Sequence, residues 1–241
     1  SDLAMRNRGV EINVSADVLR IKDFTWNVNA NVSYNKNEIT ELYNGITEYV
    51  ASDTGRMVAV GHPLGEFYLN RYAGVNPTNG DALWYTKDGE ITTEYNESDK
   101  VMLGKTHEAP WQGGFGTTLS WQGFSLSAQF TWVADRWMLN NDRVFQESNG
   151  LFSAYNQSKR MLYDRWKKPG DVTDIPRYGV TPQLDSRFLE DASFLRLKNL
   201  MLSYTFPQKW LQRTNFLSSA RIYAQGQNLL TLDRKSTRLN S

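Results

Sequence analysis

Residues 10–18 read Val-Glu-Ile-Asn-Val-Ser-Ala-Asp-Val, and residues 24–34 read Phe-Thr-Trp-Asn-Val-Asn-Ala-Asn-Val-Ser-Tyr. In both stretches every second residue is apolar, and the residues between them are polar. This strict period of two predicts β-strands with one apolar face and one polar face, and no helical period fits it. The two stretches therefore predict an antiparallel pair of strands.

The connection between these strands decides which residues face each other. We expect a five-residue loop from Leu19 to Asp23, because it places Val14 opposite Val28 and keeps both apolar sets on one face. A two-residue turn at Lys22-Asp23 would set Asp17 against Val28 instead. The longer loop is the preferred interpretation.

A second hairpin is predicted around Gln122-Gly123. A two-residue turn there pairs Trp121 with Phe124 and Leu119 with Leu126, and the glycine supplies the positive φ that such a turn needs. A third, weaker pair follows near the end of the chain, where Pro207 ends a strand because proline cannot donate to the ladder. In total we expect long strands near 9–18, 24–35, 113–121, 124–133, 194–206 and 219–231.

The connections between the strands differ greatly in length. Those at one end are short, whereas the other end has two long loops, from about Asn35 to Pro110 and from about Ala134 to Ser193. Loops longer than about 15 residues are uncommon in compact soluble domains. Long strands with such an asymmetry are typical of an outer-membrane β-barrel. A soluble β-sandwich shows the same alternation, so the pattern alone leaves it open.

The composition excludes several classes of protein. The chain has 241 residues with 27 Lys and Arg and 26 Asp and Glu, and a net charge of +1 gives no reason to expect a nucleic-acid partner. Cysteine is absent, which removes disulfides, thiolate metal sites and a catalytic cysteine. The 8 Trp, 12 Tyr and 11 Phe argue against disorder. The sequence has no run of 18 apolar residues, so we expect neither a transmembrane helix nor a signal peptide at Ser1.

The sequence offers little for catalysis, and we expect no enzyme, no cofactor and no metal site. His62 and His107 lie in predicted loops, with no nucleophile or orienting carboxylate at a recognised spacing. The acidic stretch from Asp88 to Asp99 does not match the spacing of a calcium loop.

Short motifs with a recognisable order run along the chain. They are Met5-Arg-Asn-Arg-Gly-Val-Glu11, Phe24-Thr-Trp-Asn27, Asn35-Lys-Asn-Glu-Ile39, Gly61-His-Pro-Leu-Gly65, Tyr72-Ala-Gly-Val75, Gly113-Gly-Phe-Gly116, Gln122-Gly-Phe-Ser-Leu126, Arg165-Trp-Lys-Lys-Pro-Gly-Asp171, Thr173-Asp-Ile-Pro-Arg177, Ser186-Arg-Phe-Leu-Glu190, Phe194-Leu-Arg-Leu-Lys-Asn-Leu200, Leu202-Ser-Tyr204 and Gly226-Gln-Asn-Leu-Leu230. In this order they resemble the C-terminal barrel part of the SusC/RagA family of TonB-dependent outer-membrane transporters.

The resemblance implies an all-β chain, a fragment of an antiparallel transmembrane β-barrel that has 22 strands and an N-terminal plug. It implies import of a glycan or a peptide across the cell outer membrane, with outer-membrane lipid around the barrel, a SusD-like lipoprotein as a lid, and TonB acting through a missing N-terminal region. Residues 1–232 would be the barrel part. Residues 233–241 are basic and lose the alternation, and we interpret them as a non-native tail.

The long loops carry the candidate substrate-side residues. Aromatic faces can stack on sugar rings or cover peptide backbones, although packing within the loop is the more frequent role of a single aromatic residue. The candidates are Trp84, Tyr85, Trp137, Tyr155, Trp166 and Arg177. Arg165, Asp171, Asp174 and Arg177 are interpreted first as ion pairs that order the loop.

Three other functions remain open at this point. The first is a passive porin-type barrel, which would lack the plug and the TonB box. The second is a soluble carbohydrate-binding β-sandwich, which would stay in the aqueous phase without detergent. A glycoside hydrolase would need two carboxylates about 5–9.5 Å apart in a cleft.

Overall fold

The computed structural model describes residues 3–51, 56–152, 154–211 and 217–233. The chain divides into two compact units. The sheet unit comprises residues 7–36, 109–136 and 192–241, and the loop unit comprises residues 1–6, 37–108 and 137–191. The tail expected at residues 233–241 lies outside the described residues from position 234 onward.

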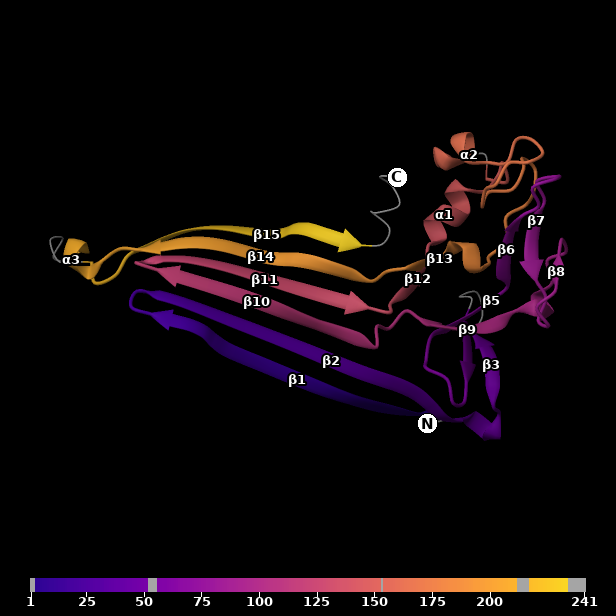
Figure 1. Ribbon diagram of the computed structural model, residues 1–241. Coiled ribbons are helices and arrows are strands. Elements are labelled where there is room, and N and C mark those ends of the chain that lie inside the picture. The colour runs from indigo at the N-terminus through magenta and orange to yellow at the C-terminus, as the bar shows by residue number, and fades with distance from the viewer. Residues whose placement is uncertain (1–2, 52–55, 153, 212–216, 234–241) are drawn as a thin grey trace. The chain divides into compact units, whose positions relative to one another are not determined.

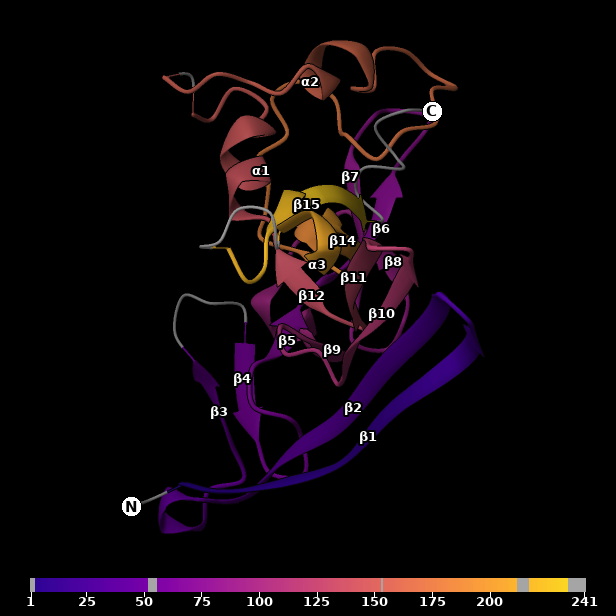
Figure 2. The same cartoon turned by 90° about the vertical axis from the view of Figure 1, so that its left-hand side faces the viewer.

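The sheet unit is built on a six-stranded antiparallel sheet in the order β1-β2-β10-β11-β14-β15 (Figure 1). Figure 2 shows these strands following one curved surface. A short helix, α3 (Gln208–Leu211), lies between the last two strands. The strands are β1 (Leu3–Ile21), β2 (Phe24–Leu42), β10 (Trp111–Trp121), β11 (Phe124–Ala134), β14 (Phe194–Thr205) and β15 (Arg221–Asp233). The predicted all-β fold with six long strands, short turns and two long loops is confirmed.

The hairpin of β10 and β11 has the predicted register. Trp121 pairs with Phe124, and Leu119 pairs with Leu126. Gln122 and Gly123 both have positive φ, at 45° and 90°, which fits a two-residue hairpin turn. The local pattern therefore sufficed to predict this part of the sheet.

The predicted five-residue loop between β1 and β2 is wrong. The strands are joined by a two-residue turn at Lys22-Asp23, and Lys22 has a φ of 47°. Asp17 Oδ1 nevertheless accepts a hydrogen bond of 3.1 Å from Asn27 Nδ2, which indicates that these two side chains lie on the same face of the sheet. A two-residue turn with regular pairing would put these side chains on opposite faces. From this hydrogen bond we infer an extra residue in β1, as in a β-bulge, which keeps the apolar residues of both strands on one face.

One face of the sheet is apolar across five strands. The register aligns a cross-strand row of Trp26, Leu119, Leu126, Leu202 and Ala224. Val28 lies one step along on the same face, as predicted. This face is uncovered: Val14 is 58% exposed and Leu126 is 41% exposed. The opposite, polar face is hollowed between Asn29 and Gln225, so the apolar rows are not the interior of a two-sheet core.

The buried apolar side chains of the described residues lie almost entirely in the loop unit. They include Phe67, Leu69 and Leu189, which pack together, and a second group of Ile39, Leu42 and Val58. In the sheet unit only Leu211 is a buried apolar residue among those described. The long sheet is therefore a single layer without a hydrophobic core of its own.

The loop unit has regular structure of its own, which the sequence did not predict. It contains sheets β3-β4-β5-β9, β6-β7-β8 and β12-β13. The elements are η1 (Tyr43–Gly45), β3 (Glu48–Ala51), β4 (Arg56–Ala59), β5 (Glu66–Leu69), β6 (Arg71–Val75), β7 (Ala82–Tyr85), β8 (Ile91–Thr92), η2 (Glu97–Asp99), β9 (Val101–Thr106), β12 (Trp137–Leu139), α1 (Asn141–Gln146), α2 (Arg160–Tyr163), η3 (Ser186–Phe188) and β13 (Leu189–Asp191). No helix among the described residues is long and apolar enough to cross a membrane.

The turn glycine gives a test of the hairpin. A Cβ at Gly123 would lie 2.7 Å from the carbonyl oxygen of Thr205, whereas Gly89, with a similar φ of 93°, has open space around it. Gly123→Ala should lower local stability by about 2–4 kcal/mol, from backbone strain plus the clash. Gly89→Ala should lose about 1 kcal/mol from strain alone. Native-state hydrogen exchange of the flanking amides measures both, and equal losses would contradict this account of the turn.

Candidate functional site

The two long loops fold together into the loop unit. Trp84 on β7 donates from its indole Nε1 to Asp185 Oδ2 at 2.9 Å, and both residues are buried. The backbone N–H of Tyr72 donates to Ser186 Oγ at 2.9 Å, and its hydroxyl donates to the carbonyl oxygen of Asp174 at 3.0 Å. Burial raises the pKa of Asp185. These hydrogen bonds therefore join β6 and β7 to the second long loop, and they fix the position of Trp84.

Trp84 and Tyr85 occupy different surroundings although they are adjacent. Trp84 is 5% exposed and contacts the rings of Tyr72 and Tyr95 edge-on. Tyr85 is half-buried, and the guanidinium of Arg71 lies 5.4 Å from its ring centroid. Trp84 is thus part of the packing between the loops, and Tyr85 has a partly accessible ring.

Trp166 and Arg177 are brought together around Gly80. A Cβ at Gly80 would come within 2.4 Å of the Trp166 ring and 2.8 Å of Arg177 Cβ. Trp166 Nε1 donates to the carbonyl oxygen of Pro77 at 3.1 Å, and Arg177 Nε donates to Asp81 Oδ1 at 2.9 Å. Both residues therefore join the second loop to the turn after β6.

Trp137 and Tyr155 have other neighbours. The ammonium of Lys105 lies 3.5 Å from the ring centroid of Trp137, which also packs against the Phe67 and Leu189 group. Tyr155 is 59% exposed and lies beside the rings of Phe145 and Phe152. Of the six candidates, Tyr155 and Arg177 have exposed side chains in this structure.

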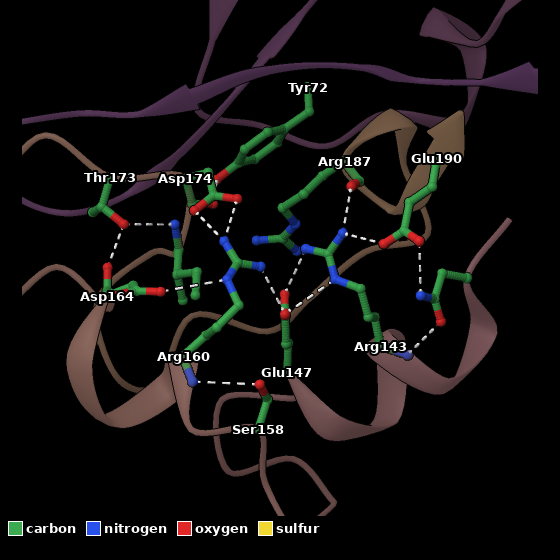
Figure 3. A network of polar contacts seen from close by, with 12 residues as sticks. Tyr72, Arg143, Glu147, Ser158, Arg160, Asp164, Thr173, Asp174, Arg187 and Glu190 are labelled. Carbon is green, nitrogen blue, oxygen red and sulfur yellow. Dashed lines mark hydrogen bonds and ion pairs between the residues drawn. The ribbon is translucent and has the colours of Figure 1, made fainter. Parts of the chain in front are cut away.

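A network of charged side chains crosses the second loop (Figure 3). Arg143 Nη2 and Nε donate to the two carboxylate oxygens of Glu147 at 2.9 and 3.1 Å, and its Nη1 donates to Glu190 at 2.9 Å. Arg160 donates to the same Glu147 at 2.8 Å and to Asp174 at 2.7 Å. Glu147 is 4% exposed. Two arginines therefore share a buried carboxylate that holds α1 and α2 together.

The ion pairs expected from the sequence are only partly present. Asp174 pairs with Arg160 rather than with Arg165 or Arg177. Arg165 instead lies over the ring of Tyr178, at 5.3 Å from its centroid. Asp171 accepts backbone hydrogen bonds from Lys167 and Lys168, which lower the pKa of its carboxyl. The missed residues, Arg143, Glu147 and Glu190, could not be found from spacing because the third lies far along the chain.

His62 has one close carboxylate partner. Its Nδ1 lies 2.9 Å from Glu66 Oε2, and Glu66 Oε1 accepts a hydrogen bond of 2.7 Å from the backbone N–H of Gly104. This arrangement orients a histidine at the surface of a loop. In the described part of the chain, no cluster of three or more His, Cys, Asp or Glu could hold a metal ion.

The charge network gives a matched pair of tests. Glu147→Gln should destabilise the second loop by about 3 kcal/mol, because it leaves two arginines facing a buried neutral amide. Asp164→Asn should change little, because Asp164 is half exposed and lies 3.4 Å from the same Arg160. Hydrogen exchange of the amides in α1 and α2 measures the difference. Equal protection in the two variants would contradict the proposed contribution of the buried Glu147 carboxylate to the stability of the loop.

The chain is similar to known proteins over most of its length. No protein-family model matches it. Among curated proteins, it is 27% identical over 250 residues to TonB-dependent receptor P3 of Formosa agariphila, covering 94% of this chain and 24% of that protein. It is 25% identical over 249 residues to TonB-dependent receptor SusC of Bacteroides thetaiotaomicron, covering 93% of this chain and 23% of that protein. The chain thus spans about a quarter of the length of these relatives.

Solved structures of transporters are similar to this chain as well. The chain superposes on a chain of the RagAB peptide transporter with a TM-score of 0.91 and 36% identity, covering 97% of this chain and 26% of that one. It also matches the RagAB peptide importer in its open-open state, with a TM-score of 0.88 and 36% identity over 96% of this chain and 26% of that one. Over nearly its whole length, the chain is therefore similar to a segment of SusC/RagA-type TonB-dependent receptors, as its motifs predicted.

Proposed function

We propose that this chain forms part of the wall and of the outer mouth of a TonB-dependent importer in the outer membrane, which takes up a peptide or a glycan. The observation that carries the proposal is the uncovered apolar face of a single-layer sheet, in a chain similar to these receptors along its length. An apolar face of this size without a core needs an apolar surrounding. Lipid supplies it, with the six strands as membrane-spanning strands.

Aromatic side chains at both ends of the apolar face support this setting. At the end with short turns, the register aligns Phe24, Trp121, Phe124 and Tyr204. At the other end, the rings of Tyr34 and Trp111 lie 4.5 Å apart. Membrane barrels carry such aromatic girdles at the two lipid–water interfaces, with an apolar band between them. The sheet of a soluble carbohydrate-binding sandwich would instead bury this face.

The partners follow from the relatives. RagAB is a peptide transporter, and SusC and P3 are TonB-dependent receptors. We infer a SusD-like lipoprotein that covers the loop unit and delivers the substrate. TonB would act through a region outside this chain, which also distinguishes the importer from a passive porin. Residues 1–232 would form the wall and mouth, with residues 233–241 as a non-native tail.

The six candidate residues are proposed to border the mouth. Tyr155 and Arg177 have exposed side chains and can contact a substrate directly. Trp84 and Trp166 hydrogen-bond within the loop unit and stabilise the conformation of the loops. This division supports a binding role rather than catalysis for the loop unit, since stacking and charge are what its exposed side chains offer.

The facing of the strands can be tested in the full-length protein. Val28→Arg should reduce the amount of folded transporter in the outer membrane, because a cation on the lipid face near mid-bilayer costs about 2–4 kcal/mol. Asn29→Arg, one residue along on the polar face, should be tolerated. Heat-modifiable mobility of the transporter in isolated outer membranes measures both. Equal damage from the two changes would count against the membrane proposal.

The mouth can be tested by binding. Tyr155→Ala should weaken substrate binding about tenfold, as loss of an exposed stacking ring does in other interfaces. Trp166→Ala should instead make the loops more sensitive to protease, because its ring packs on Gly80. Calorimetry with peptide and oligosaccharide mixtures, on the full-length transporter with its lipoprotein, measures affinity. Unchanged affinity of Tyr155→Ala, in a loop that keeps its protease resistance, would remove Tyr155 from the mouth.

A further inference from the structure

The polar face of the sheet unit contains a hollow that the loop candidates do not touch. It lies over β2, β10, β11, β14 and β15, and its floor includes Gly113 and Gly114 of β10. Gly114 lies on the polar face, and a Cβ there would lie 2.9 Å from the carbonyl oxygen of Phe130. The strands here approach too closely for side chains, so the floor stays flat.

Two register shifts meet at this hollow. Between β11 and β14, Gln129 pairs with Asn199 and Phe130 pairs with Leu197, which leaves Lys198 as an extra residue. The pairing of β14 with β15 also shifts between Leu197 and Asn199. Bulges re-aim side chains and are frequent beside functional sites. The first shift places Lys198, which is exposed and lines the hollow. The second shift leaves two residues of β15, Asn228 and Leu229, opposite Lys198.

The wall of the hollow is rich in side-chain amides. Gln225 Nε2 donates to Asn199 Oδ1 at 2.8 Å. The other side-chain amides of the wall make no hydrogen bond to another described residue: Asn29, Asn31, Gln129, Gln227 and Asn228. Each carboxamide offers two donors and an acceptor, the same groups that a peptide backbone needs to satisfy. A row of such side chains therefore matches an extended peptide.

Charge in the hollow is limited to one group. Lys198 is the single charged residue of the lining, and it forms no ion pair with another residue in the described ranges. An ammonium in an otherwise neutral, amide-lined hollow is complementary to one carboxylate. Every linear peptide carries such a group at its C-terminus, whereas a neutral oligosaccharide carries none.

We propose that this hollow is a second binding site for the imported substrate on the inner wall, that the substrate is a short peptide, and that Lys198 binds its C-terminal carboxylate. The inference rests on the proposed importer function and deepens it by naming the substrate class. The carboxamides of Gln129 and Gln227 hydrogen-bond to the backbone of the peptide. The similarity to the RagAB peptide transporter, at 36% identity, agrees with a peptide.

The test uses the full-length transporter with its lipoprotein partner in whole cells. Uptake of a labelled pentapeptide library with free C-termini is compared with uptake of the same library amidated at the C-terminus. Lys198→Met should reduce uptake of the free-acid library about three- to tenfold below saturation and leave uptake of the amidated library unchanged. Lys198→Arg should retain uptake of both libraries. The pair Gln129→Met and Gln227→Met should reduce uptake of both.

Gln112→Met is the matched control for the glutamines. Gln112 lies on the same face of β10 as Gly114 but does not line the hollow, so this variant should transport like the wild type. Equal effects of Lys198→Met on the two libraries, or none, would overturn the proposal. An increase in permeability to vancomycin, with peptide uptake unchanged, would instead assign the hollow to the plug and would also overturn it.

The wild type separates this inference from the proposed function. If it imports oligosaccharides but neither peptide library, the importer function stands and the peptide site is refuted. If it imports none of these, both proposals fail.

Discussion

The antiparallel hydrogen-bond ladder from β1 to β15 is the constraint on which the rest of the structure depends. It holds six strands together although the described residues of the sheet unit bury almost no apolar side chains. A sheet in water normally gains its stability by packing one face against another layer. Here the apolar face is uncovered, so the favourable energy of burying it must come from the surroundings. The uncovered apolar face therefore supports the proposed position of the sheet in lipid.

The loop unit, unlike the sheet unit, has buried side chains of its own. It buries Phe67, Phe188 and Ile175 almost completely and satisfies a buried carboxylate with two arginines. Buried ion pairs of this kind contribute little net stability relative to apolar packing, but removing one partner is costly. The consequence is a mouth with a fixed shape, in which exposed side chains such as Tyr155 keep their positions. Recognition can then vary in the loops while the ladder stays the same.

The sequence predicted the sheet well where structure is local. The register of β10 and β11 follows from alternation and one glycine, because a two-residue turn leaves no freedom. It failed between β1 and β2, where the turn has two residues instead of five. The alternation stops at Val18, so it could not decide which residues between Val18 and Phe24 belong to a strand and which to the turn. The interior of the loop unit was out of reach for another reason. Trp84 and Asp185 are 101 positions apart, and nothing near either residue indicates the other.

The two edge strands of the sheet bear on the proposed membrane location. Within the described residues, β1 and β15 are each paired on one side only. In lipid, an unpaired backbone N–H or C=O costs several kcal/mol, so an open edge cannot persist there. The proposed membrane location therefore requires further strands on both sides of this sheet, and relatives about four times as long as this chain have room for them. Expressed by itself, the sheet would expose two long edges and one apolar face to water, the combination that favours edge-to-edge aggregation.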